Sequence, residues 1–221
     1  MIDEHRITIP RSARYYTLGA TGPGIVEVWF ALHGYGQLAS LFLRQLAPLD
    51  DGSRLIVAPE ALSRFYLGGI GERPSSERAV GASWMTREDR LAEIDDQVRY
   101  LDAVYTEVVA GIDRSRARVC VLGFSQGAPA AARWLHYGNA RAERLILWGG
   151  EIPPDLDLSQ KPGRLAGLDL TLVAGTRDQY ITPKILDREK QRLEADAIPF
   201  RLVSFEGGHE IDEVVLRQLA G

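Results

Sequence analysis

Cysteine is nearly absent from the sequence, and long apolar runs are absent altogether. The single cysteine, Cys120, excludes an intrachain disulfide, and its place within the apolar run 119–122 predicts a buried, inert thiol. No apolar stretch approaches the roughly 20 residues that a membrane span needs. The N-terminal segment MIDEHRITIPRSARYY is mixed and charged, unlike a secretory signal. We therefore expect a cytoplasmic protein without a transmembrane segment.

A positive charge excess is also missing. The chain has 26 Lys and Arg against 30 Asp and Glu, a formal net charge of -4, and no dense basic run. This balance argues against nucleic acid as a partner. A length of 221 residues is enough to bury a sizeable core, and we expect one domain over residues 1–221. Whether that domain forms a homodimer is left open.

Short apolar runs alternate with longer segments of helical periodicity, which is typical of α/β folds with a mostly parallel sheet. The predicted strands are Arg6–Ile9, Arg14–Leu18, Val26–Leu32, Arg54–Ala58, Arg118–Leu122, Arg144–Trp148, Asp169–Ala174 and Phe200–Phe205. The first two are expected to form an antiparallel hairpin at one edge. The predicted helices are Ala39–Leu46, Arg87–Val109, Gln126–His136, Pro183–Ala195 and Ile211–Leu219.

One irregular zone, residues 59–86, lies between the fourth predicted strand and the longest helix. It is rich in glycine and also carries aromatic and apolar side chains, among them Tyr66, Trp84 and Met85. Loops of this length inside compact domains are usually functional or disordered, and these apolar residues disfavour disorder. We interpret the zone as a lid or pocket wall whose apolar side chains bind substrate. The alternative is that these side chains only cap the sheet.

The tract GFSQG, residues 123–127, matches the nucleophile-elbow pattern G-x-S-x-G. The pattern alone is weak, because about one chain in ten of this composition would contain it by chance. Its context is much more specific, since an apolar strand precedes it and an alanine-rich helix follows. A hydroxyl at such a turn projects from the carboxyl edge of the sheet. Ser125 is therefore the candidate nucleophile.

A serine nucleophile needs a base, and the base needs an acid to orient it. In this architecture the order along the chain is Ser, then Asp or Glu, then His. Of the four histidines only His209 comes late enough, just after the last predicted strand. Asp178 follows the preceding strand and is the best candidate acid. The alternatives are a generic surface histidine and an ordinary solvated-loop aspartate.

Two backbone amides are expected to bind the developing oxyanion. One is the N–H of Gln126, directly after the candidate nucleophile. The other is the N–H of Tyr35, in the tract LHGYG that follows the third predicted strand. His33, in the same tract, is expected to hold this loop by a hydrogen bond rather than to act as a base.

With LHGYG, GFSQG, the Asp178 loop and Gly208-His209 in place, the chain resembles the phospholipase/carboxylesterase family of α/β-hydrolases, which includes the acyl-protein thioesterases. The resemblance runs from about Val26 to the C-terminus. It implies an α/β-hydrolase fold with helices on both faces of the sheet and no separate cap domain. It also implies the catalytic set Ser125, Asp178 and His209, oxyanion amides from Tyr35 and Gln126, and an acyl-binding wall around Trp84.

The leading hypothesis is a serine hydrolase that needs no metal and no cofactor and cleaves carboxylic esters or thioesters of small molecules or lipids through an acyl-enzyme. One alternative keeps the same residues but cleaves an amide or peptide bond. Another is a ligand-binding protein that has kept the fold and lost turnover, since a fold alone never proves activity.

Overall fold

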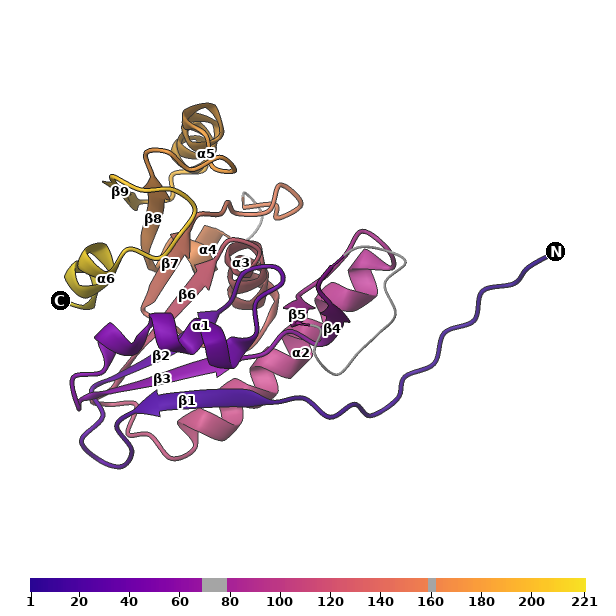
Figure 1. The fold of residues 1–221 in the computed structure, drawn as a ribbon, viewed down its shortest axis with the longest axis horizontal. Helices are drawn as coiled ribbons and strands as arrows, with labels where there is room; N and C mark the ends of the chain where they lie inside the picture. The colour runs from indigo at the N-terminus through magenta and orange to yellow at the C-terminus, as the bar shows by residue number, and fades with distance from the viewer. Residues whose placement is uncertain (69–78, 159–161) are drawn as a thin grey trace.

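The computed structural model describes residues 1–68, 79–158 and 162–221 (Figure 1). Its main sheet contains the strands β1 (Tyr15–Gly19), β2 (Glu27–Leu32), β3 (Arg54–Pro59), β6 (Arg118–Phe124), β7 (Arg144–Trp148), β8 (Asp169–Gly175) and β9 (Phe200–Phe205). A smaller sheet pairs β4 (Ser63–Tyr66) with β5 (Val80–Ser83). The helices are α1 (Ala39–Gln45), α2 (Arg90–Val109), α3 (Gly127–Tyr137), α4 (Pro162–Leu165), α5 (Pro183–Ala195) and α6 (Glu213–Ala220), and a 3-10 turn, η1, spans Ala47–Leu49.

The order of the main sheet is β1-β3-β2-β6-β7-β8-β9. Every neighbouring pair is parallel except β1 and β3, which are antiparallel at the edge. The carboxyl ends of β2, β6, β7, β8 and β9 therefore lie along one edge of the sheet, where open α/β sheets place their sites. The predicted fold class, a mostly parallel sheet in an α/β architecture, is confirmed.

Side chains alternate between two cores along each central strand, as the period of an extended chain requires. In β2, Val28 and Phe30 join the core under α2 and α3, whereas Trp29 joins the core under α1 and α6. Figure 1 shows these helices on the two faces of the sheet. Cys120 lies in the second core and is buried, and burial raises the pKa of its thiol, which agrees with an inert role.

The predicted N-terminal hairpin is wrong. Residues 6–9 form no strand, and β1 pairs instead with the distant β3. The alternating residues of RITI suggest a strand, but Ile7 and Ile9 are exposed, and the next residue, Pro10, cannot donate to a ladder. The segment is irregular and contacts the body at single points: Arg6 pairs with Asp89 at 2.8 Å, and the Arg14 carbonyl accepts from the Glu60 N–H at 3.1 Å.

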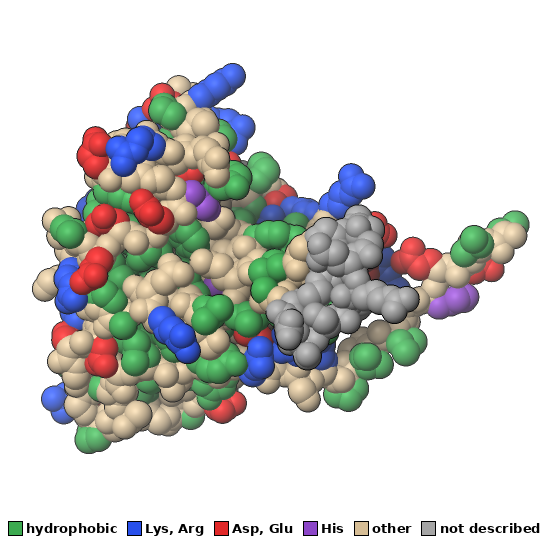
Figure 2. Space-filling model, viewed as in Figure 1, with side chains coloured by type: hydrophobic (Ala, Val, Ile, Leu, Met, Phe, Trp, Pro, Cys, Tyr) green, Lys and Arg blue, Asp and Glu red, His purple; other side chains and the backbone are tan. Residues whose placement is uncertain are grey.

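The zone 59–86 contains the β4–β5 pair, which the sequence did not predict. The interpretation of this zone as a lid falls partly on residues 69–78, which lie outside the described residues, and it stays a prediction. Among the helices of the described ranges, none combines the length and the apolar character that crossing a bilayer requires. Figure 2 shows acidic and basic side chains interspersed over the visible face, in keeping with the small net charge of -4.

Candidate active site

Ser125 occupies a sharp turn between β6 and α3. Its φ is +54°, a left-handed backbone conformation that is costly for a residue with a Cβ. The flanking glycines make the turn possible, because a Cβ on Gly123 would collide with the Gly127 carbonyl and a Cβ on Gly127 with the Leu32 carbonyl. The elbow is thus packed tightly against both its own helix and strand β2, and it presents Ser125 at the carboxyl edge of the sheet.

Asp178 and His209 lie together although 31 residues separate them in the sequence. The Nδ1 atom of His209 is 2.7 Å from Oδ2 of Asp178, and the Asp178 side chain is only 1 % exposed. The backbone N–H groups of Tyr180 and Ile181 donate to the other carboxylate oxygen at 2.8 and 3.0 Å. These bonds fix the carboxylate, so that it receives the Nδ1 proton of the imidazole and leaves Nε2 as the other ring atom for chemistry.

The charge of Asp178 is stabilised in the fold. Burial opposes ionisation, but the N–H of Ile181, the imidazole of His209 and the N–H of Tyr180 outweigh it and hold the pKa of Asp178 below its usual range. The imidazole is held from two further sides, by the Phe124 ring at 5.0 Å and the Tyr180 ring at 4.7 Å between centroids.

Gly149 and Gly150, directly after β7, pack against the histidine and the serine turn respectively. A Cβ on Gly149 would lie 3.0 Å from Cε1 of His209, and a Cβ on Gly150 would lie 2.7 Å from the Ser125 carbonyl oxygen. The structure therefore brings Ser125, Asp178 and His209 to one place. Among the described residues Ser125 Oγ has no hydrogen-bond partner, and such contacts are often long in enzymes without substrate.

The loop after β2 packs directly on the nucleophile turn, since a Cβ on Gly34 would be 3.2 Å from Cβ of Ser125. Gln37 accepts a hydrogen bond from the Gly34 N–H at 2.8 Å, and the Gly36 N–H donates to the Ala82 carbonyl at 2.9 Å. Within the part of the chain that the structure describes, the N–H groups of Tyr35 and Gln126 find no acceptor. Two amides on adjacent loops thus remain available beside the hydroxyl.

His33 holds this loop, as the sequence predicted. It is fully buried, with Nδ1 2.8 Å from the Gly34 carbonyl and Nε2 accepting from the Ala61 N–H at 3.1 Å. Accepting at one nitrogen and donating at the other requires the neutral ring, and burial lowers its pKa accordingly. Both nitrogens are engaged, so His33 cannot serve as the base.

A cavity of about 420 Å³ opens in front of the serine. Its walls are mostly apolar, and they come from the ends of β5, β6, β7 and β8 and from helix α3. The lining residues are Trp84, Met85, Ser125, Gln126, Pro129, Ala130, Arg133, Gly149, Gly150, Glu151, Ile152, Pro153, Pro154, Tyr180 and Ile181.

Of the residues predicted to bind substrate, Trp84 and Met85 line this cavity. Trp84 is buried, and its indole N–H donates to the His33 carbonyl at 2.8 Å. The Gln126 side chain ties this wall to the elbow, accepting from the Trp84 N–H and donating to the Met85 carbonyl. Tyr66 lies elsewhere, half-exposed on β4, and is not part of the cavity wall.

Sequence reasoning missed Arg133, Tyr180 and the Gly149-Gly150 pair. The glycine pair had a detectable signal, because two glycines directly follow a buried strand that neighbours the serine strand. Arg133 also had one, as the only residue with a formal charge in the otherwise apolar run GAPAAARWLHY. Tyr180 had none beyond its closeness to Asp178 in the sequence.

A comparison with protein-family models matches residues 28–220 to the family described as Phospholipase/Carboxylesterase. The chain belongs to the phospholipase/carboxylesterase family. The resemblance carried by LHGYG and GFSQG is thereby confirmed. Family membership supports a hydrolase that acts on carboxylic esters or thioesters. A search of curated proteins by sequence gave no match.

Solved structures of the same architecture agree with the assignment of the fold. Acyl-protein thioesterase 2 of Zea mays superposes with a TM-score of 0.70 at 16 % identity, covering 95 % of this chain and 96 % of its own. Esterase PE8 superposes with a TM-score of 0.67 at 22 % identity, covering 95 % of this chain and 97 % of its own. The carboxylesterase of Bacillus cereus superposes with a TM-score of 0.65 at 19 % identity, covering 94 % of this chain and 92 % of its own.

Proposed function

We propose that this member of the family is a serine hydrolase that cleaves carboxylic esters or thioesters through an acyl-enzyme. Ser125 is the nucleophile, His209 the general base and acid, and Asp178 the residue that orients the imidazole. The observation that carries the proposal is the 2.7 Å contact between His209 and Asp178. The imidazole packs on Gly149, and the next residue, Gly150, packs on the left-handed Ser125 turn. Strained backbone at a cavity is where a nucleophile is expected.

The proposed reaction follows from these positions. Nε2 of His209 takes the proton of Ser125 Oγ as the oxygen attacks the acyl carbon, and the ring returns it to the leaving alcohol or thiol. The N–H groups of Tyr35 and Gln126 stabilise the tetrahedral anion, each contributing about a hundredfold in rate. A water molecule then releases the acid by the same route, with Asp178 stabilising the charged imidazole throughout.

The apolar walls favour an acyl group over a polar substrate in the cavity. Trp84 and Met85 stand on one side, and Ile152, Pro153 and Pro154 are also part of the lining. Such a surface stabilises an acyl chain by removing it from water.

The test is steady-state hydrolysis of matched butanoate ester, thioester and amide substrates by the wild type and by Ser125→Ala. We expect ester or thioester turnover, with kcat reduced roughly 10⁵- to 10⁶-fold in the variant. Thermal unfolding of both proteins controls for folding. Ordinary activity in a folded Ser125→Ala would overturn the assignment of the nucleophile, and preferential amide cleavage would overturn the assignment of the substrate class.

A further inference from the structure

The cavity contains a buried cation that the proposed mechanism does not use. Arg133 lies on α3, and its side chain is only 6 % exposed. Gln126, Pro129 or Ala130, and Arg133 follow one another at steps of three or four, so they form one ridge of the helix that leads from the elbow along the cavity wall. The ridge spans about 10 Å between Gln126 and Arg133, since each helical residue rises about 1.5 Å.

The guanidinium of Arg133 is only partly satisfied by the protein. One edge binds Asp155, with Nε donating to Oδ2 at 3.2 Å and Nη2 to Oδ1 at 2.8 Å. The remaining nitrogen, Nη1, faces the sulfur of Met85 at 3.3 Å. A thioether is a weak acceptor, whereas a buried charged donor ordinarily has a strong one. Among the described residues Nη1 therefore has only this weak acceptor, and a ligand in the cavity can supply a stronger one.

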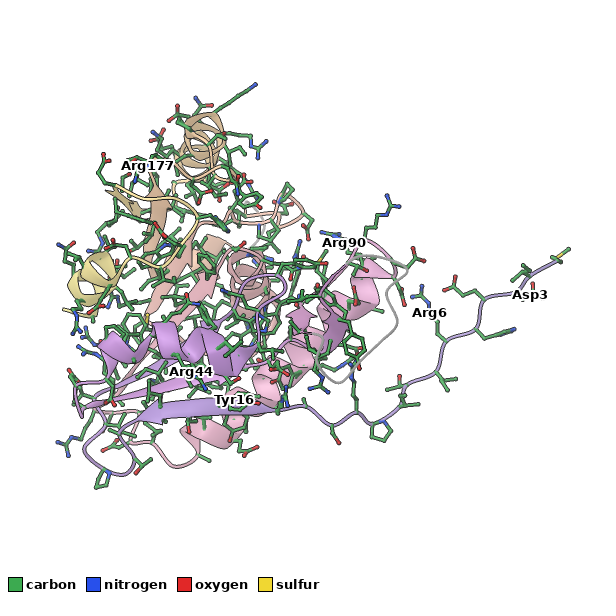
Figure 3. All side chains as sticks on the ribbon, viewed as in Figure 1. Asp3, Arg6, Tyr16, Arg44, Arg90 and Arg177 are labelled. Carbon is green, nitrogen blue, oxygen red and sulfur yellow. The ribbon has the colours of Figure 1, made fainter. Side chains whose placement is uncertain are left out.

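The local charge balance also favours an anion. Asp155 is shared, because Arg90 at the start of α2 approaches its Oδ1 at 2.6 Å (Arg90 is labelled in Figure 3). Two guanidinium groups on one carboxylate leave a net charge of +1 at this wall. The other charged residue of the lining, Glu151, is compensated by Arg188 at 2.6 Å. At the Arg133 wall the cavity thus combines apolar sides with one net positive charge.

We propose that Arg133 is a specificity-determining residue that binds a carboxylate carried by the substrate, through Nη1. The preferred substrates are esters or thioesters with a second, free carboxylate, separated from the scissile carbonyl by an apolar chain that follows the Pro129–Ala130 wall. This inference rests on the proposed hydrolase function. The carboxylate belongs either to the acyl part, as in a half-ester of a dicarboxylic acid, or to the leaving group, as in an acylated hydroxy acid.

The experiment compares kcat/KM for carboxylated and uncharged substrates of equal chain length. The acyl arm uses para-nitrophenyl monoesters of adipic and suberic acid against the hexanoate and octanoate esters. The leaving-group arm uses acetate esters of hydroxy acids against those of the matching alcohols. We expect the wild type to favour the carboxylated member in one arm, and the preferred arm identifies the position of the carboxylate.

Three variants isolate the role of Arg133. Arg133→Met keeps an unbranched apolar stem, and Arg90 still pairs with Asp155, so no carboxylate is orphaned. We expect the carboxylate preference to fall about ten- to hundredfold, the usual worth of a hydrogen bond to a charged group. Arg133→Lys keeps the charge and should restore part of the preference. Arg90→Met is the comparison variant, because it removes the charge of the partly exposed Arg90 but keeps the Nη1 donor of Arg133. The preference should therefore fall by no more than about threefold, the share of the screened charge alone.

Isothermal titration calorimetry of the wild type and Arg133→Met with adipic acid monoamide and with hexanamide measures binding of the carboxylate without ester turnover. We expect the monoamide to bind the wild type more tightly than the uncharged hexanamide and to lose that advantage in the variant. No carboxylate preference in either arm, or equal losses in Arg133→Met and Arg90→Met, would overturn the inference while leaving ester hydrolysis intact. Tight binding of the monoamide without hydrolysis of any ester would instead refute the proposed function.

Discussion

Gly149 is the position where the geometry of the site can be disturbed without removing any reacting group. Its φ is +58°, and a Cβ there would lie 3.0 Å from Cε1 and 3.1 Å from Nδ1 of His209. Gly149→Ala therefore adds about 1–2 kcal/mol of backbone strain. It also crowds the imidazole by roughly 0.5 Å relative to the usual 3.5–4.0 Å carbon contact. Since a 1 Å misplacement costs about a hundredfold, kcat/KM should fall about ten- to hundredfold.

Gly52→Ala is the matched control. Gly52 also has a positive φ, +82°, but nothing lies within 4 Å of an added Cβ, and it precedes β3 at the opposite edge of the sheet. Both variants should lower the unfolding midpoint by about 2–8 °C. Ester kinetics and thermal melts of the two proteins separate strain from displacement. The reasoning about the imidazole would be refuted if Gly149→Ala kept the wild-type kcat/KM, or if kcat/KM fell by the same factor in Gly52→Ala as in Gly149→Ala.

Two further substitutions test the buried carboxylates. Asp178→Asn should lower kcat by about 10⁴ through the wrong imidazole tautomer, and rates within tenfold of the wild type would contradict its role. The pKa of Asp178 is lower in the folded than in the unfolded protein, so its ionised carboxylate stabilises the fold above the unfolded pKa, near 4, and this contribution is lost as the pH falls through the folded pKa. In Asp178→Asn the free energy of unfolding should therefore decrease less steeply in acid than in the wild type. Glu189 behaves oppositely, because burial raises its pKa, so folding is weakened as the pH rises from about 4 through the raised pKa. In Glu189→Gln the amide oxygen can still accept from the Ile152 N–H. The variant should be more stable than the wild type at neutral pH and equal to it in acid. Urea titrations at several pH values measure this, and the reverse order of stabilities would refute the reasoning.

The sequence predicts the central architecture well because buried parallel strands are continuous apolar runs. Arg144–Trp148, Pro183–Ala195 and Phe200–Phe205 agree with the structure to the residue. Helix α5 begins at Pro183 because the Thr182 hydroxyl caps it by accepting from the Ile185 N–H, and Asp212 caps α6 in the same way. These caps end the loops that carry Asp178 and His209. Both residues could be found from the sequence because each lies in the loop after a predicted strand.

The contacts that the sequence could not predict join segments far apart in the chain. The pairing of β1 with β3 depends on a partner about 40 residues away, whereas the local pattern suggests a hairpin. The fit of Gly149 against His209 depends on the side-by-side packing of the loops after β7, β8 and β9. The exposure of Arg133 to the cavity depends on which face of α3 turns toward the loop 150–156. No local signal encodes these distances.

The most direct test of the central claim is intact-mass spectrometry after treatment with a fluorophosphonate, comparing the wild type with Ser125→Ala. The account predicts one covalent adduct on the wild type and none on the variant, because only a serine activated by a neighbouring imidazole reacts at neutral pH. A folded wild type that forms no adduct, or a variant that still forms one, would contradict Ser125 as the nucleophile.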